Sequence, residues 1–266
     1  MSQPGEAPPR AMIDVVDLHK SFDGVPVLRG VNLRVAEGQT VVLLGMSGSG
    51  KTVLLKHLIG LHRAERGEVW VDGQEVGALL AGGRGQRDAL DELRRGIGIL
   101  FQSDALFDSL TVFDNVAFGL REQLHLGERE VERRVTSILR EVGLSDVRDE
   151  LPSVLSGGMR KRVAFARAAV GEPKLLLYDE PTAGLDPLTT QSVVEIIARA
   201  RAGGITTLAV IFDVAAAMAV ADEIAFLHDG RILEQGPPEA LMRSAHPELR
   251  AFLHDWLESG RVVHHA

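Results

Sequence analysis

The chain has 266 residues, of which 45% are hydrophobic and 25% charged, a composition that excludes a disordered chain and a coiled coil. Its formal net charge of −8 disfavours non-specific binding to DNA or RNA, so we expect no nucleic-acid partner. It contains no cysteine, which excludes disulfides and thiolate metal sites.

Residues 1–11 are polar and proline-rich, so we expect a flexible lead without a signal peptide. The longest apolar runs, such as LAVIF at 208–212, fall far short of the ~20 residues that span a bilayer. These features predict a cytoplasmic protein that acts on a membrane only through a partner.

Alternating apolar and polar positions predict strands in residues 12–42, with a turn at Asp23-Gly24. The apolar run at 40–45 is typical of a strand that is buried on both faces, and it leads into a helix at 52–61.

Asp72-Gly73 predicts a hairpin, whereas residues 77–96 are expected to form a loop or an insertion. Further along we predict a helix at 128–142, a strand at 173–181, a helix at 192–201, a strand at 206–212, a hairpin at 223–236 and an amphipathic helix at 249–257. Alternating strands and helices indicate a parallel α/β core, and the break in this pattern around 101–160 indicates an inserted helical subdomain.

The stretch GMSGSGKT at 45–52 lies between a predicted strand and a predicted helix, which is the setting of a phosphate-binding P-loop. Its glycines would let backbone N–H groups turn onto phosphates, Lys51 would reach the β- and γ-phosphates, and Thr52 would bind Mg²⁺. The alternative is a glycine-rich turn without a ligand. The predicted nucleotide-binding residues of this stretch are Gly45, Met46, Ser47, Gly48, Ser49, Gly50, Lys51, Thr52 and Val53.

Two carboxylates, Asp179 and Glu180, end a predicted buried strand. Because ligands bind at this end of the strands in an α/β sheet, both should face the P-loop. Asp179 is then a predicted ligand of Mg²⁺, and Glu180 would orient or deprotonate the attacking water. Gln102, at the end of another predicted strand, would bind Mg²⁺ and water. The alternatives are an acidic turn that stabilises the next helix and, for Gln102, an ordinary first loop residue.

Phe22, near a strand end, would stack on adenine or else belong to the core. Ser156 precedes Gly157 and Gly158 at the start of a basic helix, so it is expected to be an N-cap that leaves backbone amides free for an anion. One P-loop already serves one nucleotide, so this second anion site is surplus within one chain. It becomes useful if two chains pair head to tail and each covers the other's ATP.

The P-loop, Gln102, LSGGM, LLLYDEP and AGLD occur in the order and spacing of ATP-binding cassette (ABC) transporter ATPases, which the chain resembles from about residue 12 to 240. The resemblance implies an α/β P-loop NTPase core with N-terminal antiparallel strands, a helical subdomain at about 103–165 and a C-terminal helical extension at 241–266. It also implies a homodimer that binds ATP and Mg²⁺, closes with ATP and opens on hydrolysis. Its partners would be integral membrane permease subunits at the inner face of the cytoplasmic membrane.

In this family's pattern Lys51, Gln102 and Glu180 are the catalytic residues. Phe22 falls at the adenine-stacking position, and Asp186 falls in the loop that touches the opposite subunit. The runs around the P-loop and FQSDALFDSLTVFDNV are similar to Mla-type phospholipid transporters, which implies a lipid cargo and leaves room for a small regulatory subunit. Residues 103–110 are expected to dock on the permease, the alternative being a local patch under the helical subdomain.

Phe212 stands where this family has a switch histidine that contacts the γ-phosphate. A phenyl ring cannot donate that hydrogen bond, so we expect slow hydrolysis unless the alignment is shifted by one residue or a neighbouring group takes over. His228 ends the next strand, but nothing in the sequence brings it to the phosphate. Two alternative functions therefore stay open: an ATP-dependent dimerisation switch and a soluble ABC-type ATPase with slow hydrolysis.

Overall fold

The computed structural model describes residues 9–102 and 104–263, apart from the side chains of residues 255 and 257–263. Most of the expected N-terminal lead, Ser103 in the expected docking segment, and His264 and His265 lie outside the described residues. Among the helices of the described residues, none combines the length and the apolar character that crossing a bilayer requires.

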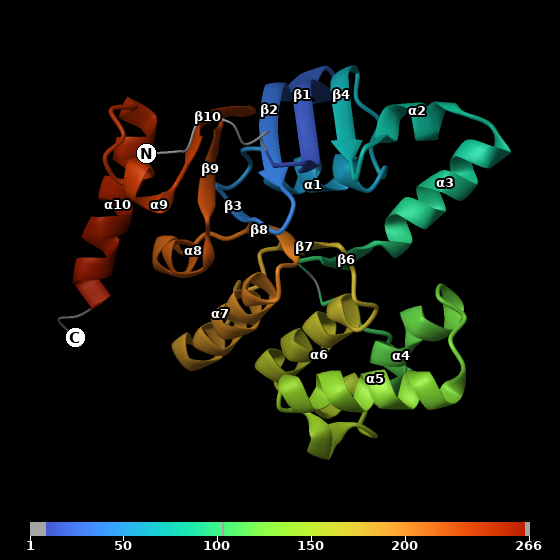
Figure 1. Ribbon diagram of the computed structural model, residues 1–266. Helices are drawn as coiled ribbons and strands as arrows, with labels where there is room; N and C mark the ends of the chain where they lie inside the picture. Colours follow the sequence, from blue (N-terminus) through green and yellow to red (C-terminus); the bar gives the residue numbers. More distant parts are fainter. Residues whose placement is uncertain (1–8, 103, 264–266) are drawn as a thin grey trace.

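Two sheets form the upper part of the molecule (Figure 1). The antiparallel sheet has the order β2-β1-β4-β5, with β1 Ala11–Phe22, β2 Val25–Ala36, β4 Arg66–Val71 and β5 Gln74–Glu75. The larger sheet has the order β10-β9-β3-β8-β7-β6, with β3 Thr40–Leu44, β6 Ile97–Leu100, β7 Leu175–Asp179, β8 Thr206–Val210, β9 Glu223–His228 and β10 Arg231–Gly236. Its strands run parallel except β10, which pairs antiparallel with β9. The predicted α/β class with antiparallel strands at the start is confirmed.

Tight turns close the three predicted hairpins. In the first, Asp23 and Gly24 have φ of 50° and 77°, and β1 and β2 pair across them. A two-residue hairpin turn with positive φ at both positions matches the twist of the strands, and it favours Asp-Gly because glycine adopts this conformation without strain. The same pairs of residue types turn β4 into β5 and β9 into β10.

The parallel strands are buried on both faces, as the continuous apolar runs predict. On β3, Val41 and Leu43 belong to the core shared with α1 (Lys51–Leu58) and the antiparallel sheet. Val42 and Leu44 face the opposite core, which contains α7 (Pro187–Ala202) and α8 (Val214–Val220). A strand covered in this way can expose only its ends, so polar groups at the strand ends are the ones available for chemistry.

A helical lobe lies below the sheets in Figure 1 and has its own apolar core. It consists of α4 (Val112–Glu122), α5 (Glu128–Glu141), the short 3₁₀ helices η1 (Ser145–Val147) and η2 (Pro152–Val154), and α6 (Gly157–Ala169). The amphipathic pattern predicted at 128–142 is confirmed, because Val131, Val135 and Leu139 are buried on one face of α5.

The expectation of a loop at residues 77–96 is wrong. This segment forms two helices, α2 (Val76–Ala81) and α3 (Arg84–Arg95), which extend to the right in Figure 1. The Glu75 carboxylate caps α2 by accepting hydrogen bonds from the backbone N–H groups of Gly77 and Ala78. Leu90 and Leu93 anchor one face of α3 in the core, so the glycines of this region interrupt the helices only at 82–83.

At the C-terminus, α9 (Pro238–Leu241) and α10 (Pro247–Val263) follow β10. Leu249 and Leu253 of α10 are buried, and the Phe252 ring lies 5.2 Å from that of Phe226 on β9. The predicted amphipathic helix therefore packs on the core of its own chain; the side chain of Leu257 lies outside what the structure describes.

Asn115 ties the start of the helical lobe to the loop before it, and its removal should destabilise the protein. It is fully buried on α4; Oδ1 accepts from the Phe107 N–H at 2.8 Å, and Nδ2 donates to the carbonyls of Phe107, Leu110 and Thr111 at 3.1, 3.0 and 3.0 Å. Asn115→Ala leaves these backbone groups without hydrogen-bond partners and should lower the free energy of unfolding by about 2 kcal/mol. Denaturant unfolding measures it, with Gln123→Ala at the exposed end of α4 as the control. Equal midpoints for the two variants would contradict this assignment.

Candidate functional site

The loop between β3 and α1 has the geometry of an anion cradle. Gly48 and Gly50 have φ of 78° and 104°, a region that favours glycine, and a Cβ on Gly50 would come within 2.8 Å of Leu28 Cδ2. Gly50 is the N-cap of α1 and no side chain caps this helix. The free N–H groups of its first turn, together with the helix dipole, suit a phosphate.

Lys51 is buried and points back into this loop. Its Nζ donates to the carbonyl oxygens of Gly45 and Met46, both at 2.8 Å. Burial lowers the pKa of Lys51, while the charges of Glu180 and Asp179 oppose that shift. The Phe212 ring lies 4.3 Å from Nζ, so an aromatic face covers the ammonium in a cation–π contact that the sequence did not predict.

The side chains of Thr52, in the first turn of α1, and Asp179, at the end of β7, meet. The Thr52 hydroxyl donates to Asp179 Oδ1 at 3.1 Å, although the two residues are 127 positions apart in the chain. Burial raises the pKa of Asp179, and the hydrogen bond from Thr52 partly offsets that rise. A hydroxyl and a carboxylate are oxygen ligands of the kind that Mg²⁺ takes alongside substrate phosphates and water. Within the described ranges no cluster of three or more His, Asp or Glu side chains could hold an ion by itself.

Glu180 lies next to this pair, and Gln102 reaches it from another strand. Gln102 Nε2 donates to Glu180 Oε2 at 2.7 Å. Gln102 follows the end of β6 by two residues, so it is a loop residue whose side chain nevertheless lies at the carboxylate. Burial and the neighbouring charge of Asp179 raise the pKa of Glu180, which makes it a stronger base when ionised.

The backbone at Glu180 is strained, with φ of 54°, while its N–H donates to the Val210 carbonyl at 3.0 Å. A non-glycine residue held in this region marks a position that the surrounding structure determines strongly.

Three residues that sequence reasoning did not single out hold the loop after Gln102. Lys161, buried on α6, donates to the Gln102 carbonyl at 3.0 Å and pairs with Asp104 at 2.9 Å. Arg167, two turns further on, donates to the carbonyl oxygens of Asp104 and Ala105. Asn115 holds the far end of the loop. For Lys161 and Arg167 the one signal in the sequence was the excess of Lys and Arg on a helix that is otherwise apolar.

Phe22 ends β1 with 38% of its surface exposed, which is too much for a core aromatic. His62 contacts its ring edge-on, with centroids 5.2 Å apart, and Lys20 Nζ lies 5.2 Å from its centroid. An aromatic ring is therefore partly exposed at the end of β1, where it could stack on a flat ligand.

Ser156 caps α6, and its Oγ accepts from the Met159 N–H at 3.3 Å. Gly158 has a packing role besides any anion role, because a Cβ there would come within 2.4 Å of Thr189 Cγ2 on α7. Asp186 caps α7 by accepting from the N–H groups of Leu188 and Thr189, both at 3.0 Å.

The two stretches that the sequence predicts to bind anions are separate within one chain. Across the described residues no hydrogen bond or ion pair joins residues 45–52 to 156–158, and α1 and α6 lie in different lobes (Figure 1).

Phe212 follows β8, and Asp213 beyond it caps α8 by accepting from the Ala216 N–H at 2.6 Å.

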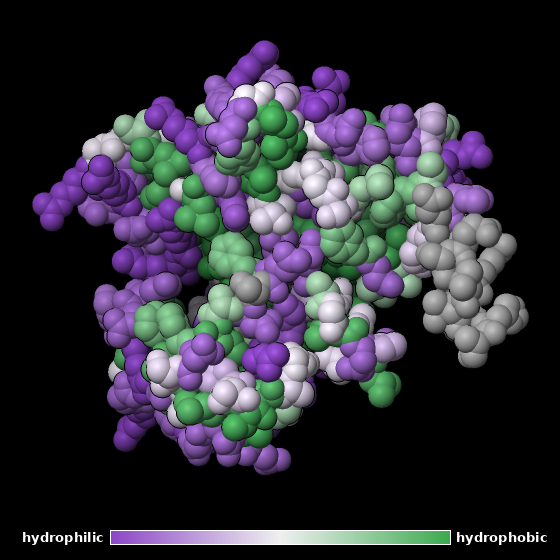
Figure 2. All heavy atoms as spheres, turned by 180° about the vertical axis from the view of Figure 1, so that it is seen from behind, coloured by the Kyte–Doolittle hydropathy of each residue, from purple (hydrophilic) through white to green (hydrophobic). Residues whose placement is uncertain are grey.

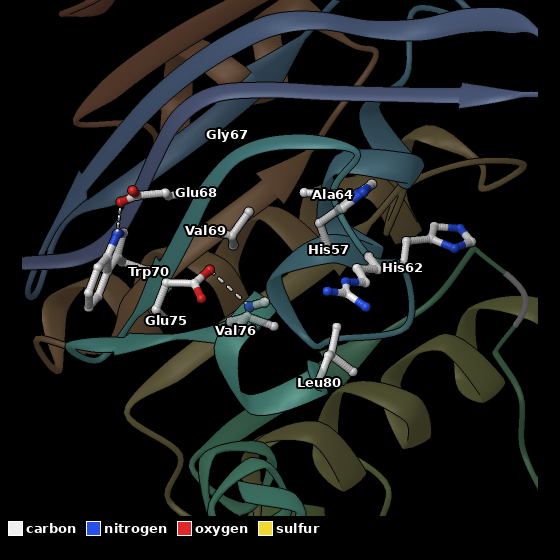
Figure 3. Close-up of a pocket in the computed structure, with 12 residues that line it drawn as sticks. His57, His62, Ala64, Gly67, Glu68, Val69, Trp70, Glu75, Val76 and Leu80 are labelled. Carbon is white, nitrogen blue, oxygen red and sulfur yellow. Dashed lines mark hydrogen bonds between the residues drawn. The ribbon is translucent and has the colours of Figure 1, made fainter. Parts of the chain in front are cut away.

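The structure has two further hollows, of which one adjoins the P-loop. One, of about 300 Å³, has His228 and Arg29 on one wall and residues 46–49 of the P-loop on the other, so the fold brings His228 beside the loop. The other, of about 260 Å³, is drawn in Figure 3. There Trp70 Nε1 donates to Glu68 at 2.9 Å and Glu75 caps α2, whereas the buried Nε2 of His57 has no hydrogen-bond partner among the described residues.

Comparison with known proteins agrees with this geometry. The sequence pattern of the ABC transporter family matches residues 28–183, more than half of the chain. Protein TRIGALACTOSYLDIACYLGLYCEROL 3, chloroplastic, of Arabidopsis thaliana is 37% identical over 258 residues, with 91% of this chain and 73% of that protein covered. The probable ribonucleotide transport ATP-binding protein mkl of Mycobacterium leprae is 40% identical over 253 residues, with 94% and 70% covered.

Among solved structures, the dimeric post-hydrolysis state of the ATP-binding cassette MJ0796 bound to ADP and Pi is similar, with a TM-score of 0.76 at 28% identity over 85% of this chain and 99% of that one. The chain therefore belongs to the ABC transporter family, as an ATP-binding subunit that hydrolyses ATP and uses Mg²⁺.

Proposed function

We propose that this chain powers phospholipid transport through a separate membrane permease, from the cytoplasmic face of the membrane. The observation that carries the coupling is the position of Gln102: its side chain bonds Glu180, and its carbonyl is held by Lys161 at the start of the loop 102–110. The lipid cargo is supported by the resemblance to Mla-type transporters and by the Arabidopsis relative, whose name is that of a diacylglycerol lipid. The mycobacterial relative is named for ribonucleotide transport, so the cargo is the part that needs the direct test below.

Within the site we assign the roles from the contacts. Lys51 and the N–H groups of the P-loop neutralise phosphate charge, and Thr52 and Asp179 hold the metal. Glu180, with its raised pKa and its hydrogen bond from Gln102, orients and deprotonates water. Bound ATP supplies the bond to be cleaved, and Mg²⁺ offsets the charge that develops on its phosphates.

We also propose a head-to-tail homodimer in which Ser156, Gly157 and Gly158 of one chain face the nucleotide of the other, and Asp186 lies at that interface. The separation of the two anion-binding stretches within one chain supports it. So does the dimeric ADP-bound structure of MJ0796, although that assembly is a property of that protein. A small regulatory subunit remains a further partner that the resemblance suggests.

The docking surface for the permease is a largely apolar hollow of about 460 Å³ between α3 and β6 on one side and α4 and α6 on the other. Figure 2 shows the hollow between the helical lobe, at the lower left, and the part of the molecule above it. Phe107 is 43% exposed and lies against Phe118, with ring centroids 4.7 Å apart. Two aromatic rings left accessible beside a groove are typical of a protein interface.

Glu180→Gln should bind ATP and Mg²⁺ but trap a closed dimer, because the amide keeps the shape of the side chain and cannot take a proton from water. We expect turnover to fall by roughly 10²–10⁴-fold. Light scattering with saturating ATP measures the dimer, and Lys51→Ala, which loses the main phosphate-binding charge, serves as a monomeric control. A Glu180→Gln chain that stays monomeric would refute the head-to-tail arrangement.

Phe212→His should raise kcat at least tenfold with little change in ATP affinity. A positioned imidazole donates a hydrogen bond to the γ-phosphate, and loss of one such donor costs on the order of 10²–10³ in rate. Phe212→Leu is the matched control, because it removes the ring from Lys51 without adding a donor. If the wild-type chain turns over at ordinary transporter rates and the histidine does not improve it, position 212 is not the switch.

Phe107→Glu should release the permease from the complex while ATP binding stays intact, since a carboxylate in an apolar interface is costly to desolvate. Co-purification from native membranes measures the loss, and Val16→Glu, which puts the same charge on an exposed apolar position of β1, is the control. Lipid extracted from the wild-type complex tests the cargo in the same preparation. We expect phospholipid; a complex without lipid, whose ATPase activity responds to a nucleotide or an amino acid, would overturn the proposed cargo.

A further inference from the structure

A hollow of about 360 Å³ lies where the helical lobe meets the core, between α5 and the end of α6 on one side and β7 and α7 on the other. No residue assigned above to the nucleotide, the partner chain or the docking loop lines it. Its volume is at the small end of the range for ligand pockets. Its walls are mostly apolar, formed by Ile138, Val142, Val170, Leu176, Ile196 and Ile205.

Tyr178 supplies an unused donor to this hollow. Its side chain is 1% exposed and its ring packs against Phe165, with centroids 4.8 Å apart. Nothing in residues 9–102 or 104–263 forms a hydrogen bond with its hydroxyl, and the residue lines the hollow together with Leu176, two positions earlier on β7. Burial raises the pKa of Tyr178, so the phenol keeps its proton and can donate it. Because Tyr178 lines the hollow, its hydroxyl is available to a ligand there.

Arg199 supplies an unpaired positive charge to the same hollow. It is exposed on α7, and it has no ion-pair or hydrogen-bonding partner for its guanidinium among the described residues. The other two arginines that line the hollow are occupied: Arg133 pairs with Glu130 at 2.6 Å, and Arg134 pairs with Glu130 at 2.7 Å and with Glu172 at 3.2 Å. Arg199 is thus the cation available to an acidic group.

We propose that this hollow binds a single-chain aliphatic acid. The alkyl chain lies on the apolar walls, and the carboxylate accepts hydrogen bonds from the Tyr178 hydroxyl and the Arg199 guanidinium. The small volume favours one short chain over a two-chain lipid. Because the walls come from both lobes, the bound acid contacts α5 and α7 together and stabilises their arrangement.

Titration calorimetry on the full chain tests the site, with sodium decanoate below its micelle concentration as the probe. We expect one molecule per chain and no equivalent binding of decylammonium, which has the same tail and the opposite charge. Arg199→Ala should weaken decanoate binding by about tenfold and Tyr178→Phe by about fivefold. Arg87→Ala, an exposed arginine on α3, should leave it unchanged.

Ala200→Phe, which fills the hollow from α7, provides a second block that keeps both polar groups and should abolish decanoate binding while ATP still binds. Equal binding of decylammonium would overturn the proposal, as would decanoate binding that survives both Arg199→Ala and Ala200→Phe. Binding confined to vesicles of phosphatidylglycerol would overturn it too, because it would identify a membrane surface as the ligand. None of these readouts depends on ATP turnover or on a permease, so failure here leaves the proposed transport function untouched.

Discussion

The candidate site depends on two carboxylates at the end of one buried strand, because each needs a specific hydrogen-bond partner there. β7 is covered on both faces, so Asp179 and Glu180 leave the sheet in a partly dehydrated setting where a charged oxygen is expensive. Each has a specific partner, Thr52 for Asp179 and Gln102 for Glu180. Lys51 adds a positive charge nearby but is itself bonded to P-loop carbonyls. Burial raises the pKa of both carboxyl groups, and it also makes each of them depend on its hydrogen-bond partner.

Helix α6 connects the candidate site to the loop that follows Gln102. Lys161 reaches the backbone of Gln102 and the side chain of Asp104, so the helix that begins with Ser156 also holds the loop that follows Gln102. The apolar hollow beside Phe107 lies on the other side of that loop. The same helix therefore carries the stretch proposed to face the second chain and holds the loop between the candidate site and the hollow proposed for the permease.

Much of this could be predicted from sequence, because the signals were local. The Asp-Gly turns, the apolar strand runs, and the P-loop with its glycines depend on neighbouring residues, and all are found in the structure. The helices α2 and α3 were missed because Gly82 and Gly83 break the pattern between them, and the Glu75 cap was not recognised. Lys161, Arg167 and Asn115 could not be found, because what they hold is backbone that only the fold brings near. The contact between Phe212 and Lys51 was hidden for the same reason: it joins residues 161 positions apart.

The close approach of Gly158 to Thr189 has a mechanical consequence. α6 has 13 residues, so it is a rod about 20 Å long, rising ~1.5 Å per residue. Its first turn lies against α7, and Arg167 near its other end holds the loop beside the hollow that we propose as the docking surface for the permease. A rod transmits a displacement along its length where a linker would absorb it. If that hollow holds the permease as proposed, a displacement there would be passed along α6 to α7 and to the loop of Asp186 as well as to Ser156.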